Sequence, residues 1–218
     1  MKKQFWLDRW AERRIGFHLP DVNPHLRRHW RHLEIPSGAE VLVPLCGKSL
    51  DMLWLREQGY RVLGVELSDI ALEDFARENL LRPDWVEEGG FRRAAWENLT
   101  LLHGDFFHLA LEQTRNVQAV YDRAALVALP EEMRKVYARK MACLLQPGTA
   151  LLLVSMDYPG EQMNGPPFNV SEAEIESLYG DSFDVRLRES VDILARNPQL
   201  ADKGITRMCE QIWVMRRS

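Results

Sequence analysis

The segment Val41-Leu42-Val43-Pro44-Leu45-Cys46-Gly47-Lys48-Ser49 decides the fold, because an unbroken apolar run gives way abruptly to a short polar loop. A run of this kind, bounded by turn residues, is typical of a buried strand in a parallel sheet. The next stretch, 50–58, carries apolar residues at helical spacing and is followed by Gly59. A second apolar strand follows at 61–66. A strand, a helix and a strand in this order predict a right-handed crossover unit.

The same alternation continues along the chain. Ser68, Pro130 and Ser171 are placed to begin further helices, the last with Glu174 completing a capping box. Further strands are predicted at 99–102, 117–121, 150–156, 183–193 and 207–216. The last two follow one another directly, which predicts an antiparallel pair at one sheet edge. We therefore expect an α/β fold: an open, doubly wound sheet, mostly parallel, with an N-terminal helical arm.

Size and composition limit the classes of protein to consider. The chain has 218 residues, a net charge of −4 and 46% hydrophobic residues. These values predict one domain over 1–218. Because the regular pattern of strands and helices begins near residue 40, we expect a helical arm or lid at 1–35 and an α/β core at 40–218. The acidic balance argues against nucleic acid as a partner. No apolar run approaches the roughly 20 residues that span a bilayer.

The N-terminal segment and the cysteines bear on location and assembly. Asp8 interrupts the N-terminal segment where a signal peptide would need its apolar centre. Three cysteines far apart, Cys46, Cys143 and Cys209, favour a reducing compartment, so we expect a cytoplasmic protein. No exposed apolar stripe is evident in the sequence, which favours a monomer.

In a doubly wound sheet, ligands bind beyond the carboxyl ends of the strands. Glu66 ends the second strand 20 residues after Cys46, the spacing at which a carboxylate accepts hydrogen bonds from ribose hydroxyls. The alternative is a solvated residue that caps the next helix. The loop before it has one glycine, Gly47, in place of the glycine-rich motif that cradles a pyrophosphate. This favours a nucleoside ligand without a diphosphate, although Gly47 as a plain turn residue is the alternative.

Two other strand ends offer candidates. Asp105 and Phe106 would suit an adenine ring as polar partner and apolar wall, but a loop aspartate beside a core phenylalanine has the same pattern. Asp122 and Arg123 form either a structural charge pair or a cation over the mouth of the site. The segment 165–168, Gly-Pro-Pro-Phe, is either a stiff connection or a wall on the substrate side.

The N-terminal arm places Trp6 and Trp10 on one helical face. We expect Trp6 to pack in the core and Trp10, with Phe17, to cover a ligand. His18 is a weaker candidate for a base, because a lone histidine is more often structural.

Three further histidines, His25, His29 and His32, share one face of a predicted helix over 24–33. No acid or cysteine nearby completes a metal-ligand set, so an exposed face is expected and no metal site.

Together these motifs resemble those of the thiopurine S-methyltransferase family, in particular its bacterial branch. The resemblance runs from about residue 5 to about residue 213, and Pro-Leu-Cys-Gly-Lys takes the place of the glycine-rich loop usual in other class I methyltransferases. It is carried by FWLDRW at 5–10, GFH at 16–18, VPLCGKSLDM at 43–52, GVELS at 64–68, YDRAALVAL at 121–129 and GPPF at 165–168.

The resemblance implies a Rossmann-like class I fold, S-adenosylmethionine as methyl donor, S-adenosylhomocysteine as co-product and no metal. The donor-binding residues it implies are Trp10, Leu45, Glu66 and Arg123, with Gly47 in the loop and Asp105 and Phe106 beside the adenine. Phe17 and Arg123 would face the acceptor, and Arg123 is the best candidate for activating it.

The family methylates aromatic and heterocyclic thiols, including thiopurines. Some bacterial relatives are associated with methylation of selenium and tellurium oxyanions, so metalloid detoxification is an alternative role. A non-catalytic ligand-binding protein of the same fold is another alternative. A nicotinamide-dependent oxidoreductase would need the pyrophosphate loop that this sequence lacks.

Overall fold

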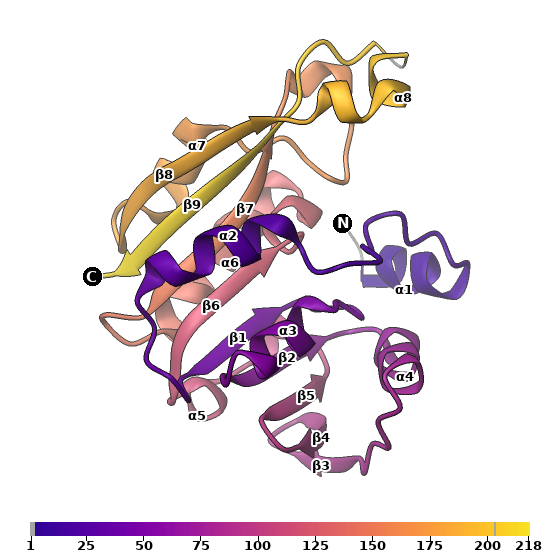
Figure 1. The fold of residues 1–218 in the computed structure, drawn as a ribbon, viewed down its shortest axis with the longest axis vertical. Coiled ribbons are helices and arrows are strands. Elements are labelled where there is room, and N and C mark those ends of the chain that lie inside the picture. The colour runs from indigo at the N-terminus through magenta and orange to yellow at the C-terminus, as the bar shows by residue number, and fades with distance from the viewer. Residues whose placement is uncertain (1–2, 203) are drawn as a thin grey trace.

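The computed structural model describes residues 3–202 and 204–218, which are built around a central sheet of nine strands (Figure 1). The strand order is β3-β4-β5-β2-β1-β6-β7-β9-β8. The five strands from β5 to β7 are parallel, and the pairs at both edges are antiparallel. The bounds are β1 Glu40–Pro44, β2 Arg61–Glu66, β3 Val86–Glu88, β4 Phe91–Trp96, β5 Leu99–His103, β6 Val117–Arg123, β7 Ala150–Asp157, β8 Phe183–Asp192 and β9 Cys209–Arg217.

Helices cover both faces of this sheet. In Figure 1, α2 and α3 lie in front of the strands, whereas α6 and α7 lie behind them. The bounds are α1 Lys3–Ala11, α2 Pro24–His29, α3 Asp51–Glu57, α4 Asp69–Glu78, α5 Leu111–Thr114, α6 Glu131–Leu144, α7 Glu172–Tyr179 and α8 Pro198–Ala201. None of the described helices has the length and apolar character needed to cross a membrane.

The doubly wound, mostly parallel sheet and its antiparallel C-terminal pair are confirmed. One hairpin, β3 and β4, was not predicted, because its strands are short and rich in charge. Its turn is Gly89-Gly90, with φ of +59° and +83°. A Gly-Gly pair between two short strands indicates a two-residue hairpin turn. The hydrophobic pattern of the strands does not indicate this hairpin.

The predicted helix starts are also found, with one difference. Ser68 Oγ accepts a hydrogen bond from the Ala71 backbone N–H at 3.3 Å, and Ser171 Oγ accepts one from Glu174 at 3.3 Å. The Glu174 carboxylate, however, binds the buried guanidinium of Arg134 at 2.6 and 3.0 Å instead of reaching back to Ser171. The Ser171 half of the predicted capping box therefore forms, whereas the Glu174 side chain joins α7 to α6 through Arg134.

The core has two layers because alternate residues of a strand point to opposite faces of the sheet. In β1, Leu42 belongs to the buried cluster that contains side chains of α6 and α7, whereas Val41 and Val43 belong to the cluster that contains those of α2, α3 and α4. With both faces covered, the central strands read as continuous apolar runs. This arrangement leaves the ends of the strands as the place where polar side chains can gather.

Candidate active site

A cavity of about 450 Å³ lies at the carboxyl ends of the parallel strands, and residues of the N-terminal arm line one side of it. Its volume falls within the range of small-molecule sites. All eight residues that the family resemblance implies for donor or acceptor binding line this cavity: Trp10, Phe17, Leu45, Gly47, Glu66, Asp105, Phe106 and Arg123. They come from the arm and from the ends of β1, β2, β5 and β6, so the tertiary structure brings together residues that are far apart along the chain.

Glu66 holds two loops together through its carboxylate. Its Oε1 accepts the Ser68 backbone N–H and its Oε2 accepts that of Gly47, both at 2.8 Å. The side chain is 7% exposed. Burial raises the pKa of the Glu66 carboxyl, and the hydrogen bonds from Ser68, Gly47 and Leu67 limit the rise. Each carboxylate oxygen can accept a second hydrogen bond, so both retain an acceptor position for a ligand.

The loop after β1 has an unusual backbone. Leu45 and Gly47 have φ of +47° and +54°. A positive φ is rare for a bulky residue such as leucine, and backbone strain of this kind concentrates at ligand sites. A Cβ added to Gly47 would lie 3.1 Å from Cζ2 of Trp10. Gly47 is thus more than a turn residue, because the arm packs directly on it.

Aromatic rings of the arm form the cover of the cavity. Trp6 and Trp10 each meet the ring of Phe17 edge-on, with ring centroids 5.6 Å apart. Trp10 is 3% exposed and lines the cavity, but the prediction that Trp6 packs in the core is wrong. Trp6 lines the cavity, and its indole Nε1 is buried without a hydrogen-bond partner in the described structure. An ion pair between Lys3 Nζ and Asp105 Oδ2, 2.6 Å apart, ties the arm to the loop after β5.

Asp105 and Phe106 were interpreted either as a loop aspartate beside a core phenylalanine or as residues of the ligand site, and their positions fit both descriptions. Asp105 Oδ1 accepts the Phe107 backbone N–H at 3.0 Å and so caps a short 3-10 turn. Phe106 is a core residue, 3% exposed, whose ring centroid lies 5.0 Å from that of Tyr137. Both residues nevertheless line the cavity, because the turn lies at its wall.

Asp122 and Arg123 do not form the charge pair that their sequence allowed. Neighbouring residues of a strand point to opposite faces, and β6 separates these two side chains. Asp122 is fully buried, where it accepts hydrogen bonds from the Ala125 and Leu126 backbones at 3.2 Å and from the Tyr137 hydroxyl at 2.7 Å. Burial raises the pKa of the Asp122 carboxyl to about 6.

Arg123 lies on the other side of the strand and lines the cavity, which is the position that the interpretation as a cation at the site requires. Its guanidinium donates a hydrogen bond to the backbone oxygen of Phe17 at 2.8 Å. The half-buried guanidinium thus positions the arm while it presents a positive charge to the cavity.

His18, Pro166 and Pro167 also line the cavity. Burial, with the nearby charge of Lys48, lowers the pKa of the His18 imidazole, which favours a neutral ring able to accept a proton. The two prolines form a wall, as one interpretation of their motif proposed. Their segment is fixed by the Phe168 backbone N–H, which donates to the Val127 oxygen at 2.7 Å.

Four charged residues that line the cavity were not nominated from the sequence: Lys3, Arg9, Lys48 and Glu210. Lys48 is buried and pairs with Glu78, its Nζ lying 2.7 and 3.0 Å from the two carboxylate oxygens. Glu210 belongs to β9, and its Oε2 is bonded to Nε2 of His25 at 2.8 Å. No local signal marks Glu210, because it reaches the site only through the antiparallel pairing of β9 with β7.

The expectation that His25, His29 and His32 share an exposed face is wrong for two of the three. His25 and His29 are 7% exposed each, because α2 packs their side against β8 and β9, and only His32 is exposed.

Comparison with solved structures defines the class of protein. A methyltransferase from Anabaena variabilis that depends on S-adenosylmethionine matches 99% of this chain and 94% of its own length, with a TM-score of 0.68 and 15% identity. The 1,6-didemethyltoxoflavin N1-methyltransferase of Burkholderia thailandensis, solved with bound S-adenosylhomocysteine, covers 99% of this chain and 86% of its own, with a TM-score of 0.66 and 15% identity. These matches show that the fold is the class I methyltransferase fold.

Comparison of sequences defines the family. The family model described as thiopurine S-methyltransferase matches residues 1–218. A thiopurine S-methyltransferase of Nitrosospira multiformis is 47% identical over 215 residues, which are 99% of this chain and 98% of the relative. The chain therefore belongs to the thiopurine S-methyltransferase family, and it is an enzyme of the methyltransferase class.

Proposed function

We propose that the chain is an S-methyltransferase for thiopurines and other aromatic or heterocyclic thiols, with S-adenosylhomocysteine as co-product. One observation carries the proposal. A ribose-type carboxylate, Glu66, and a cation, Arg123, line the same largely apolar cavity beneath an aromatic cover. This combination suits a nucleoside donor on one side and a flat, electron-rich acceptor on the other.

The donor half of the site is formed by the loops after β1, β2 and β5. We assign ribose binding to the remaining acceptor positions of Glu66, close approach of the donor to the backbone at Leu45 and Gly47, and the adenine to Asp105 and Phe106. Trp10 would cover this half, since it already packs on Gly47. The donor supplies a methyl group on a positively charged sulfur, and the surrounding residues hold it in place and exclude water.

The acceptor half is formed by Phe17, Pro166, Pro167 and Arg123. Its flat, apolar walls fit a planar heterocycle, and the guanidinium of Arg123 favours the thiolate form of the acceptor. Heteroaromatic thiols ionise more readily than a cysteine side chain, so a strong protein base is not required. Orientation of sulfur and methyl group for in-line attack can supply up to about 7–11 kcal/mol.

We further propose that residues 1–35 act as a lid on the 40–218 core. The contacts that support this role are the Lys3–Asp105 ion pair, the hydrogen bond from Arg123 to the Phe17 oxygen and the packing of Trp10 on Gly47. Each of them joins the arm to a residue of the cavity wall. Three free cysteines support a reducing, cytoplasmic setting for the reaction.

The test is isothermal titration of the purified chain with S-adenosylhomocysteine and with NAD, followed by turnover assays with 6-mercaptopurine and with selenite. Binding of S-adenosylhomocysteine alone and faster turnover of the thiol are expected. Faster turnover of selenite would favour the metalloid role. Donor binding without any turnover would favour a ligand-binding protein of the same fold, and binding of NAD would contradict the proposal.

A further inference from the structure

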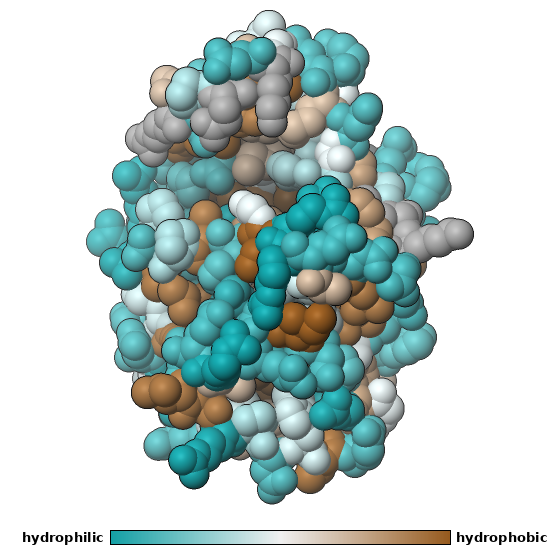
Figure 2. Space-filling model, turned by 90° about the vertical axis from the view of Figure 1, so that its right-hand side faces the viewer, coloured by the Kyte–Doolittle hydropathy of each residue, from teal (hydrophilic) through white to brown (hydrophobic). Residues whose placement is uncertain are grey.

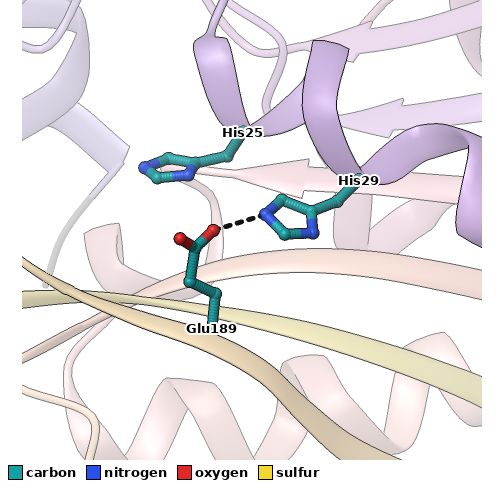
Figure 3. A group of neighbouring side chains, drawn as sticks. All are labelled: His25, His29 and Glu189. Carbon is teal, nitrogen blue, oxygen red and sulfur yellow. Dashed lines mark hydrogen bonds and ion pairs between the residues drawn. The ribbon is translucent and has the colours of Figure 1, made fainter.

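A second group of chemistry-bearing side chains lies where α2 meets the antiparallel edge of the sheet. His25 and His29 come from α2 and Glu189 from β8 (Figure 3). One ligand atom from each of the three lies within 4.8 Å of the other two. We propose that His25, His29 and Glu189 bind one divalent transition-metal ion with the coordination chemistry of zinc. The site is separate from the methyl-transfer reaction, and the proposal does not depend on the acceptor.

The geometry of the two histidines favours a shared ion. Residues four apart on a helix lie on the same face, and a histidine pair at this spacing is a recurrent zinc-binding arrangement. The two rings are nearly parallel, with an interplanar angle of 27° and centroids 6.3 Å apart. Figure 3 shows the Glu189 carboxylate facing both rings from the neighbouring strand.

The distances are close to those of a coordinated ion. Zinc bonds of about 2.0–2.1 Å in a tetrahedron place neighbouring ligand atoms about 3.3 Å apart. Glu189 Oε2 and His29 Nε2 are now 2.7 Å apart, and no pair among the three ligand atoms exceeds 4.8 Å. The tetrahedral spacing falls between these values, so small side-chain rotations suffice to admit the ion.

The surroundings supply partners that orient metal ligands. Nε2 of His25 is engaged by Glu210 at 2.8 Å, which leaves Nδ1 for the metal. A carboxylate on the second nitrogen of a coordinating histidine is a common outer-shell arrangement, and it fixes the ring and its tautomer. Arg28 fixes the orientation of the Glu189 carboxylate, because its Nη1 lies 2.8 and 3.1 Å from the two carboxylate oxygens.

The nitrogen of His29 that faces Glu189 is Nε2, 2.7 Å from Oε2, so Nε2 is the atom that would bind the ion. The ligand set of two imidazoles and one carboxylate suits zinc, cobalt or nickel and does not suit magnesium, which prefers oxygen ligands. A bound ion would tie α2 to the β8 edge, next to Glu210 of the cavity wall.

The experiment uses the full chain without a histidine tag, first stripped with a chelator. Titration with Zn²⁺ should give one strong site per chain, Co²⁺ should give the visible absorption of a tetrahedral site, and Mg²⁺ should not bind. Zn²⁺ should also raise the Tm. His29→Gln and Glu189→Gln should weaken Zn²⁺ binding at least about tenfold and abolish the rise in Tm.

His108→Gln is the matched control, because His108 is an exposed histidine outside the cluster. Circular dichroism of the metal-free variants tests folding, and Glu189→Gln keeps a hydrogen-bonding group opposite His29 in case His29→Gln does not fold. The proposal is overturned if the wild-type chain does not bind Zn²⁺ at micromolar concentrations. It is equally overturned if both variants bind Zn²⁺ as tightly as the wild type.

Discussion

At the scale of single residues, Glu66 has a structural task and a proposed binding task. We predict that Glu66→Gln raises the Kd for S-adenosylhomocysteine between about tenfold and about a hundredfold, because charge-assisted hydrogen bonds contribute about 1.5–3 kcal/mol. Isothermal titration measures this change. Glu40→Gln is the control, because Glu40 is a half-buried glutamate at the end of β1 that lies away from the cavity. The Kd of this variant for S-adenosylhomocysteine should equal the wild-type value. Unchanged affinity in Glu66→Gln would remove the ribose assignment.

Arg123 faces the acceptor half of the cavity and also holds the arm. We predict that Arg123→Ala lowers kcat/KM for an aromatic thiol at least about tenfold, while the Kd for S-adenosylhomocysteine changes less, because the lost charge stabilises the acceptor thiolate. Steady-state kinetics and titration measure the two effects. Arg186→Ala, at an exposed arginine of β8, is the control and should behave as the wild type. Equal losses in both quantities would argue against the acceptor role.

Asp122 makes stability depend on pH. Its pKa is about 6 in the folded chain and about 3.9 in the unfolded chain, so between these values the folded state holds a proton that the unfolded state has released. The stability contributed by this group therefore falls as the pH rises from about 4 to about 6. We predict that the free energy of unfolding of the wild type, relative to Asp122→Asn, falls by about 3 kcal/mol over this interval.

Urea unfolding of both proteins at several pH values measures this difference, and other titrating groups cancel in the comparison because the two proteins share them. A difference between the two proteins that does not vary with pH would show that Asp122 does not titrate in this range.

At the scale of elements, the contact between α1 and the loop after β1 joins stability to ligand binding. Gly47→Ala places a Cβ at a residue with φ of +54° and 3.1 Å from Trp10 Cζ2. We predict a loss of stability of about 1–2 kcal/mol from the backbone alone, and weaker binding of S-adenosylhomocysteine because Trp10 must move. Thermal unfolding and titration measure the two effects.

Gly38→Ala is a matched control for this variant. Gly38 has φ of +76°, but an added Cβ would meet nothing within 4 Å. The control should lose similar stability and bind S-adenosylhomocysteine normally. If both variants bind normally, the packing of the arm on Gly47 does not shape the donor half of the site.

At the scale of the whole molecule, the edges and the surface bear on assembly. The edge strand β8 carries charged side chains at Asp184, Arg186, Arg188 and Glu189, which discourage pairing with a second sheet. The exposed large apolar residues lie on separate elements, and the face shown in Figure 2 is mostly hydrophilic with small apolar groups. We predict a monomer of 25.4 kDa in sedimentation velocity at micromolar concentration. A species of twice that mass would contradict this prediction.

Much of the fold follows from local signals in the sequence. The apolar run at 41–46 and the capping serines Ser68 and Ser171 act over a few residues, so they predict strands and helix starts correctly. The hairpin at 86–96 was not predicted, because short, charged strands have little hydrophobic periodicity. The prediction for Trp6 was wrong because helical spacing shows which residues share a face but does not show whether that face packs on the core or borders a cavity.

The sequence by itself determined the doubly wound sheet, the family and the residues at the strand ends, because each depends on short segments whose chemistry is local. Only the tertiary structure decided which distant side chains meet. Glu210 pairs with His25 across 185 residues of chain, and Glu189 pairs with His29 across 160. It also separated Asp122 from Arg123, since one is buried in the core and the other faces the cavity. Such contacts depend on how strands pair and helices pack, and a local sequence pattern does not determine this pairing and packing.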